Sequence, residues 1–450
     1  MSRTNTAANV GRLFFPQSKS LGIDRGEYSV ALLEKIVFAG TTNASFEQGR
    51  QDLLKLAEMH VSTKQVERVC HRIGGERLAQ RDRDVSAYVE LPLVDRKSAP
   101  AGVPAPPASQ VAVVGCDGGR LQILERKGQA IETEEAEADE GRSGKHWRED
   151  KIGLLMTMAS EESASDPCPE IPASFLDLTR ITKLARELKT KTSAREEAAK
   201  EAASPEAGLE ALNAPTNAPT NSKPTWTPPE VLEKRLVGTR VRWPDFGPIL
   251  AQAAWSWGFF AASRKAFVAD GSDNNWTLWR RHFSSFEPIL DFIHALSYIF
   301  ASATAGRPFA DGWQTYQEWI RWTWKGEVSK VIEALRTRQA ELGAPFAEDG
   351  ETHPRHVVAR SLSYLENHAS QMKYDEYRRL GLPITSSYVE SAVKQFNQRV
   401  KGTEKFWTER GAEAMLQLRA DHLSAHAPLA EFWKARQETQ TGQRPYHMAA

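Results

Sequence analysis

The chain has 450 residues, of which 26% are charged and 40% hydrophobic, and its 58 basic side chains balance 58 acidic ones. No apolar run reaches the about 18 residues of a membrane span, no signal-peptide core follows Met1, and the widely spaced cysteines exclude a disulfide framework or a zinc ribbon. The composition therefore predicts a globular, cytoplasmic protein of roughly two to four structural units, with no membrane contact.

Net charge leaves the class of partner open. A neutral total counts against nucleic acid, because phosphate binding usually shows as a basic excess. However, an acidic stretch at 131–140 offsets basic runs at 233–242 and 394–405, so local basic surfaces remain.

Residues 1–100 are expected to form a helical N-terminal region. Apolar residues recur at helical spacing on both sides of a short turn at 60–62, where Ser62 and Gln65 match a capping box. The glycine pair at 74–75 is expected to end the second helix. Two helices joined by a tight turn are typical of a helix-turn-helix DNA reader, and about equally of an ordinary helical hairpin. In the first case, the DNA contacts come from Lys64, Gln65, Arg68 and Arg72.

The first part of a catalytic domain is expected at 108–170, after a Pro/Ala linker. Residues 111–117 form a nearly continuous apolar run that ends at Asp117, which predicts a buried strand. The two glycines that follow predict a hairpin turn to a second strand at 121–126, and 151–160 provides a third. These assignments give an antiparallel meander.

Low-complexity sequence is expected to separate the two parts of this domain. Residues 171–235 contain a stretch rich in Lys, Arg, Glu and Ala, followed by prolines and a repeated NAPT motif. This composition predicts an insertion that is partly helical and partly disordered. The second part, 236–291, contains an apolar helix, a strand ending at Asp270, another helix, and a strand ending at Asp291.

An all-helical insertion is expected at 292–380, because apolar residues recur there every three or four positions. The helix that carries Glu390 and one further helix are expected at 381–425, and 426–450 is expected to be a tail. The order of three strands, helix, strand, helix, strand and helix is that of an RNase H-like α/β fold. We therefore expect a mixed sheet of this kind, interrupted by the helical insertion.

Asp117, Asp270 and Glu390 are expected to converge at one edge of such a sheet. Two metal ions held by shared carboxylates stabilise the attacking and leaving oxygens of an in-line displacement at phosphorus, and Mg²⁺ (or Mn²⁺) suits these oxygen ligands. Each residue also has a structural explanation. An aspartate at a strand end often forms a turn, and Ser387 with Glu390 matches a capping box.

Asp291 and His294 lie three residues apart on the same face of a helix that begins there. A buried Asp–His pair that orients the helix explains this spacing better than a direct metal-binding role.

Further residues are candidates for contact with nucleic acid. Trp319, Trp322 and Trp324 are suited to stacking on unpaired bases, although core packing explains their spacing more readily. Basic residues after Glu390 are suited to contact phosphates, and a solvated helix face explains them nearly as well. These residues are Lys394, Arg399 and Lys401.

Four sequence blocks together resemble bacterial insertion-sequence transposases of the ISKra type. The blocks are VGCDGGR, FVADGSDNNW, EPILDFIHALSYIF and PITSSYVESAVKQFNQRVKGTEKFW. These transposases are similar in plan to Mutator-like transposases, in which two aspartates, a D/C-x-x-H motif and a glutamate follow in this order. The resemblance extends from GRLFFPQ to the final helices, and the combination of ILDFIHA with ITSSYVESA is its specific part.

The resemblance implies that Asp117, Asp270 and Glu390 are the catalytic and metal-binding triad, and that Asp291 and His294 form the accessory motif. It also implies that the N-terminal helices bind DNA. The implied activity is metal-dependent cleavage at transposon ends and transfer of the freed 3′-hydroxyl into target DNA. The implied partner is double-stranded DNA, bound by a homodimer or higher oligomer in a synaptic complex, and the implied location is the bacterial nucleoid.

Three other functions remain open from the sequence. A domesticated DNA-binding protein keeps the transposase fold without catalysis, and an RNase H-like nuclease cleaves without strand transfer. A helical interaction scaffold would leave the three carboxylates scattered. Related transposases often carry a zinc-ribbon cysteine cluster before the FFP segment, and this chain has no such cluster there.

Overall fold

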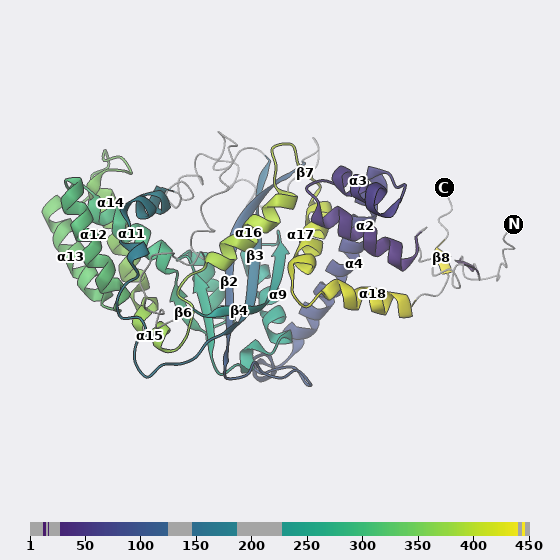
Figure 1. The fold of residues 1–450 in the computed structure, drawn as a ribbon, viewed down its shortest axis with the longest axis horizontal. Helices are drawn as coiled ribbons and strands as arrows, with labels where there is room; N and C mark the ends of the chain where they lie inside the picture. Colours follow the sequence, from purple (N-terminus) through teal and green to yellow (C-terminus); the bar gives the residue numbers. More distant parts are fainter. Residues whose placement is uncertain are drawn as a thin grey trace, which may run out of the picture.

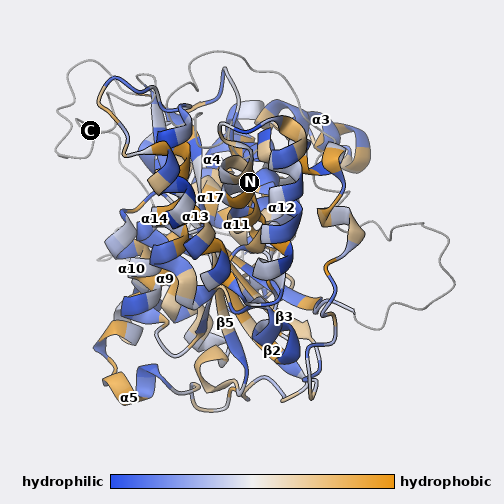
Figure 2. Cartoon of the chain, turned by 90° about the vertical axis from the view of Figure 1, so that its left-hand side faces the viewer, coloured by the Kyte–Doolittle hydropathy of each residue, from blue (hydrophilic) through white to orange (hydrophobic). Residues whose placement is uncertain are grey.

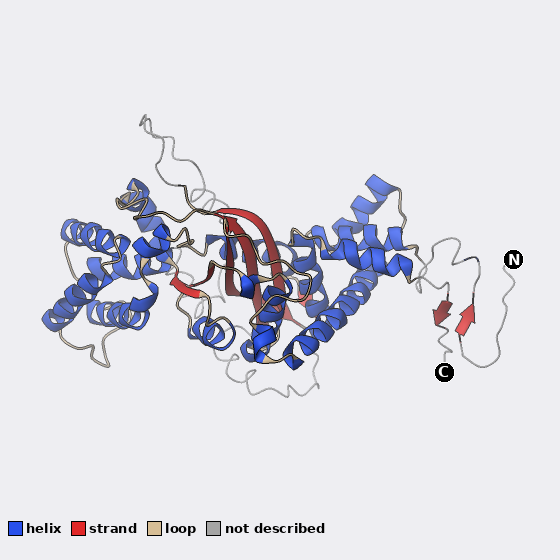
Figure 3. Ribbon diagram, turned by 90° about the horizontal axis from the view of Figure 1, so that it is seen from below, coloured by secondary structure: helices blue, strands red, loops and turns tan. Residues whose placement is uncertain are grey.

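A central sheet lies between two groups of helices (Figure 3). One group comes from the two ends of the chain, and the other comes from the 292–380 segment (Figure 1). None of the helices in the described part of the chain has the length and apolar character that crossing a membrane requires. The computed structural model describes residues 12–14, 17, 28–124, 146–186, 227–439 and 443–445.

The strands of the sheet are β2 (Gln110–Ile123), β3 (Trp147–Ala159), β4 (Glu230–Thr239), β5 (Lys265–Ala269), β6 (Glu287–Leu290) and β7 (Phe406–Trp407). Their order is β4-β3-β2-β5-β6, with β7 beside the end of β2. β3 is antiparallel to β2 and β4, whereas β5 is parallel to both β2 and β6. The predicted mixed sheet in an α/β protein is therefore confirmed.

The predicted hairpin at Gly118 and Gly119 is wrong, because residues 110–123 form one continuous strand. Pairing with β3 runs through both glycines. The third strand of the meander is β4, so the expected boundary at 235/236 falls inside a strand. Only 236–239 of β4 are buried without interruption, and this run is too short to reveal the strand in the sequence.

Gly119 is required by a close approach and not by a turn. It lies opposite Asp150 in the strand register, and a Cβ at this position would lie 2.8 Å from Asp150 Oδ1. The Asp150 side chain is buried, and neither of its oxygens has a hydrogen-bond partner among the described residues. Burial raises the pKa of this carboxyl group to about 7.

Helices cover both faces of the sheet. Neighbouring residues of a strand point to opposite faces, and β2 meets a different helix on each. The Cys116 thiol donates to the side-chain oxygen of Asn275 in α10 at 3.1 Å, whereas a Cβ at Gly115 would lie 2.7 Å from Val389 of α16. The covering helices are α9 (Trp243–Ser256), α10 (Asp273–His282), α16 (Ser387–Val400) and α17 (Glu409–Leu423).

The N-terminal helices pack against the C-terminal part of the chain. They are α2 (Val30–Thr42), α3 (Phe46–Ala57), α4 (Thr63–Glu90) and the short α5 (Leu93–Arg96). The prediction that glycines end α4 at 74–75 is wrong, since α4 is 28 residues long and continues through both glycines to Glu90. Gly74 lies against α17, where a Cβ would be 2.5 Å from the Ala414 carbonyl oxygen, and Arg77 pairs with Asp421 at 2.8 Å. α18 (Pro428–Glu438) is a helix in the segment expected to be a tail.

The described elements between β6 and α16 are all helical. They are α11 (Phe292–Thr304), α12 (Phe309–Trp324), α13 (Val328–Leu342), α14 (Pro354–His368), η3 (Ala369–Gln371) and α15 (Tyr374–Arg379). Figure 2 shows hydrophilic residues on the outward sides of α12, α13 and α14. Trp319 and Trp324 are buried, and the Arg378 guanidinium lies 3.9 Å from the centre of the Trp324 ring. Core packing, the explanation that the sequence favoured, is therefore confirmed for these two tryptophans rather than base stacking, and Trp322 is also packed against the core.

The other described elements are short. β1 (Arg12–Phe14) pairs with β8 (Gln443–Pro445), and η1 (Ala173–Phe175) and η2 (Phe259–Ala261) are single 3₁₀ turns. The insertion expected at 171–235 to be partly helical contains a helix over 178–186. Its residues 187–226, which include the NAPT-rich segment, and the acidic stretch at 131–140 lie outside the described residues.

Candidate active site

Asp117 and Asp270 lie at the same level of two neighbouring parallel strands. Gly115 of β2 pairs with Val268 of β5, and each aspartate lies two residues further along. Neighbouring strands are about 4.8 Å apart, and residues two apart on a strand share a face, so Asp117 belongs to the face of β2 that α16 covers. Asp270 directly follows β5, as predicted, whereas β2 continues past Asp117 to Ile123.

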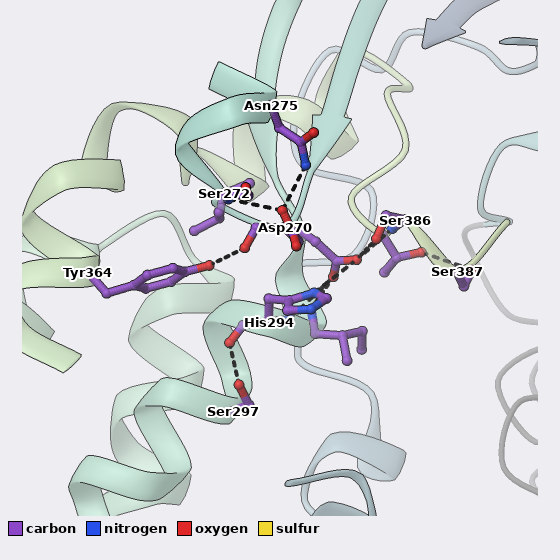
Figure 4. A network of polar contacts seen from close by, with 12 residues as sticks. Asp270, Ser272, Asn275, His294, Ser297, Tyr364, Ser386 and Ser387 are labelled. Carbon is purple, nitrogen blue, oxygen red and sulfur yellow. Dashed lines mark hydrogen bonds and ion pairs between the residues drawn. The ribbon is translucent and has the colours of Figure 1, made fainter. Parts of the chain in front are cut away.

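Asp270 is held through one of its carboxylate oxygens (Figure 4). Its Oδ1 accepts from the backbone N–H of Ser272 at 3.0 Å and from the side-chain amide of Asn275 at 2.8 Å. The turn-forming role considered for Asp270 is thus present. Asn275 is buried and also accepts from the thiol of Cys116, the neighbour of Asp117. Sequence reasoning missed Asn275, whose only sign was a polar residue in the DGSDNN block.

Glu390 lies in the first turn of α16, which begins after the N-cap residue Ser386. The capping box considered for Ser387 and Glu390 is not formed, since Ser387 already lies in the helix and no side chain caps this end. Val389 packs against Gly115. The start of α16 therefore lies over the strand that carries Asp117.

Asp291 joins two elements at the border of this site. It is buried and caps α11, with Oδ1 accepting from the N–H of Ile293 at 2.6 Å. Its Oδ2 accepts from the backbone N–H of Ser386 at 2.8 Å and from the Ser386 hydroxyl. Burial opposes its ionisation, but the charge of His294 and the hydrogen bonds from Ser386 outweigh burial and lower the pKa of Asp291. These contacts favour the orienting role over direct metal binding.

His294 interacts electrostatically with Asp291 and with two residues of the predicted catalytic triad. Its Nδ1 lies 3.6 Å from Asp291 Oδ2, which is ion-pair distance and longer than a hydrogen bond. Burial lowers the pKa of this imidazole, but Asp291, Asp270 and Glu390 outweigh burial and raise it to about 9. His294 is therefore a cation at neutral pH, and the charges of Asp270 and Glu390 contribute to its raised pKa.

The carboxylates offer suitable ligands for a hard divalent cation without forming a closed cluster. Burial, and then the charges of Asp270 and Asp117, raise the pKa of the Cys116 thiol. Within 28–124, 146–186 and 227–439, no group of three or more His, Cys, Asp or Glu side chains is arranged to hold a metal ion. Asp117 and Asp270 thus provide oxygens of the kind that Mg²⁺ or Mn²⁺ binds, but Glu390 does not complete a preformed three-ligand group.

The predicted DNA contacts in α4 differ in their availability. Lys64 and Arg68 are exposed, with Lys64 paired to Glu67 at 2.9 Å. The Gln65 side chain completes the predicted capping box by accepting from the Ser62 N–H at 2.8 Å. Arg72 lies 3.6 Å from Glu76.

The predicted phosphate contact at Arg399 is contradicted by its burial. Its Nε donates to the Gly40 carbonyl oxygen of α2 at 2.9 Å, and its guanidinium lies 4.4 Å from the centre of the Phe46 ring in α3. Arg399 lies on the inner side of α16. The sequence shows that this stretch is basic, but not which of its side chains face inward. Lys394 and Lys401 remain exposed.

Comparison of the sequence with protein-family models and with curated proteins gives no match. The case for a function therefore rests on the residues and their geometry.

Proposed function

We propose that this chain is a metal-dependent DNA transposase built on an RNase H-like sheet, with Asp117, Asp270 and Glu390 as its catalytic carboxylates. The observation that carries the proposal is the placement of the two aspartates, each two residues beyond a paired position of the adjacent parallel strands β2 and β5, with the helix that bears the glutamate packed on β2. The strand order supports the RNase H-like assignment, since three antiparallel strands are followed by two that run parallel to the first.

The chemistry would combine a divalent cation with residues that position its ligands. Bound Mg²⁺ or Mn²⁺ supplies charge stabilisation for an in-line displacement at phosphorus. Asn275 fixes one oxygen of Asp270 and leaves the second for ligand binding. Asp291 ties the segment before α16 to the start of α11, which sets where Glu390 lies. The His294 imidazolium offsets part of the negative charge among the carboxylates.

In this proposal, hydrolysis at an element end frees a 3′-hydroxyl, which then attacks target DNA at the same site. α3 and α4 act as the helix-turn-helix reader of double-stranded DNA. Support for this role comes from the short connection at 58–62 and from the exposed Lys64 and Arg68 at the start of α4. Synapsis of two DNA ends requires at least a homodimer.

A cleavage assay on DNA that contains the element ends, with Mg²⁺ or Mn²⁺, tests the proposal. Asp270→Asn is expected to abolish cleavage and strand transfer at unchanged DNA affinity. Asp273→Asn is the matched control, because it removes an exposed aspartate only three residues away. Metal-dependent cleavage without strand transfer would support the nuclease alternative. Tight binding without cleavage by the wild type would support the non-catalytic DNA-binding protein.

A further inference from the structure

Two tyrosines from different helices stack beside Asp270. Tyr298 of α11 and Tyr364 of α14 have ring centroids 3.8 Å apart and planes within 12° of parallel. The Tyr364 hydroxyl donates to the backbone carbonyl oxygen of Asp270 at 2.7 Å (Figure 4). The stacked pair therefore adjoins a predicted catalytic residue directly, unlike the buried tryptophans of α12.

Tyr364 is fixed from several sides. Gly271 follows Asp270 with a φ of +93°, and a Cβ there would lie 2.6 Å from the Tyr364 hydroxyl oxygen. The His368 ring meets Tyr364 edge-on, with centroids 4.8 Å apart. One ring face is covered by Tyr298, so Tyr364 serves as a rigid support for its partner.

Tyr298 is the other ring of the pair. It is half-buried, and its hydroxyl has no hydrogen-bond partner among the described residues. Arg360 lies one helical turn before Tyr364, is exposed, and forms no ion pair within the described part of the chain. Burial raises the pKa of the Tyr298 hydroxyl, while Arg360 lowers it and Asp270 raises it further. An aromatic ring, an unpaired cation and a catalytic carboxylate thus share one neighbourhood.

We propose that Tyr298 and Arg360 form a nucleotide subsite in which an unpaired DNA base beside the cleaved phosphodiester stacks on Tyr298 and its phosphate contacts Arg360. Every base has an aromatic face, so such a subsite accepts many sequences and selects for an unpaired end. Stacking on one aromatic ring strengthens binding by about five- to 150-fold. This inference rests on the proposed function and adds the part of the substrate that the helical segment recognises.

A fluorescence titration tests the subsite independently of catalysis. The probe is a short DNA duplex with a single-stranded overhang whose first unpaired base is 2-aminopurine, bound in Ca²⁺ to the full chain. Wild type and Tyr298→Phe are expected to quench the probe. Tyr298→Ala is expected to quench it weakly and to bind about five- to 150-fold less tightly. Phe309→Ala, an exposed aromatic residue of the same group of helices, is the matched control.

A second probe, abasic at the same position, separates stacking from a structural effect. Tyr298→Ala is expected to bind this probe as tightly as the wild type does. Equal losses on both probes, or wild-type binding with unchanged 2-aminopurine fluorescence, would overturn the subsite and leave the proposed function standing. Failure of the folded wild type to bind either DNA would overturn the proposed function as well.

Discussion

Replacing Asn275 by alanine should weaken metal binding at the candidate site. The change removes the 2.8 Å hydrogen bond to Asp270 Oδ1 and leaves the Cys116 thiol without its acceptor. A hydrogen bond to a charged group contributes about 1.5–3 kcal/mol, which corresponds to roughly 10–100-fold in an equilibrium constant. Loss of a residue that orients a metal ligand costs about the same factor.

The assay is DNA cleavage at increasing Mn²⁺ concentration, with DNA affinity and the melting temperature measured in parallel. Asn275→Ala should raise the Mn²⁺ concentration for half-maximal cleavage by about 10–100-fold and recover much of the rate at saturation. Asn274→Ala removes an exposed neighbour of the same type and should change neither value. An unchanged Mn²⁺ dependence in a folded Asn275→Ala protein would refute the positioning role.

Three further predictions concern stability and DNA binding. Gly74→Val should lower the free energy of unfolding by about 1–3 kcal/mol, because the added side chain meets α17. Gly75 faces open space, so Gly75→Ala should raise the free energy of unfolding by roughly 0.5–1 kcal/mol. Urea denaturation measures both changes. Asp150 has a raised pKa of about 7, so the stability that its neutral form provides is complete below about pH 4 and lost as the pH rises through about 7. Asp150→Asn should therefore leave stability unchanged at about pH 4 and increase it by up to about 4 kcal/mol at about pH 8, and equal effects at both pH values would contradict this. Arg399→Leu should destabilise the fold without altering the salt dependence of DNA binding. Lys401 is expected to contact a phosphate, so Lys401→Ala should reduce by about one the slope of the logarithm of the DNA binding constant against the logarithm of the salt concentration.

The strands that are buried on both faces could be predicted from the sequence, because burial leaves an uninterrupted apolar run. This holds for β5, which ends directly before Asp270. β4 could not be predicted in this way, since its first half is exposed and polar. Two glycines in succession suggested a turn within β2, but their role is to leave space for side chains of β3. Local turn propensity cannot distinguish these causes, because the atoms that require the space come from another strand.

The spacing of residues in the sequence also predicted where part of the candidate site lies, but it did not predict the contacts that support the site. Asp270 and the Asp291–His294 pair occupy the strand end and helix start that the sequence indicated. Asn275, Ser386 and Tyr364 were missed because each acts through a partner brought near only by the tertiary fold.

Arg399 has a consequence for the geometry of the proposed reaction. It binds the backbone of α2 and packs on Phe46 of α3, while its own helix bears Glu390 nine residues earlier. The helices proposed to read DNA and the helix proposed to carry a catalytic residue are thus connected directly through the Arg399 side chain. In the proposed transposase, this contact fixes the distance between the DNA-reading helices and Glu390. The number of base pairs between the recognised sequence and the broken bond is then set by the folded protein and is the same at every DNA end that it processes.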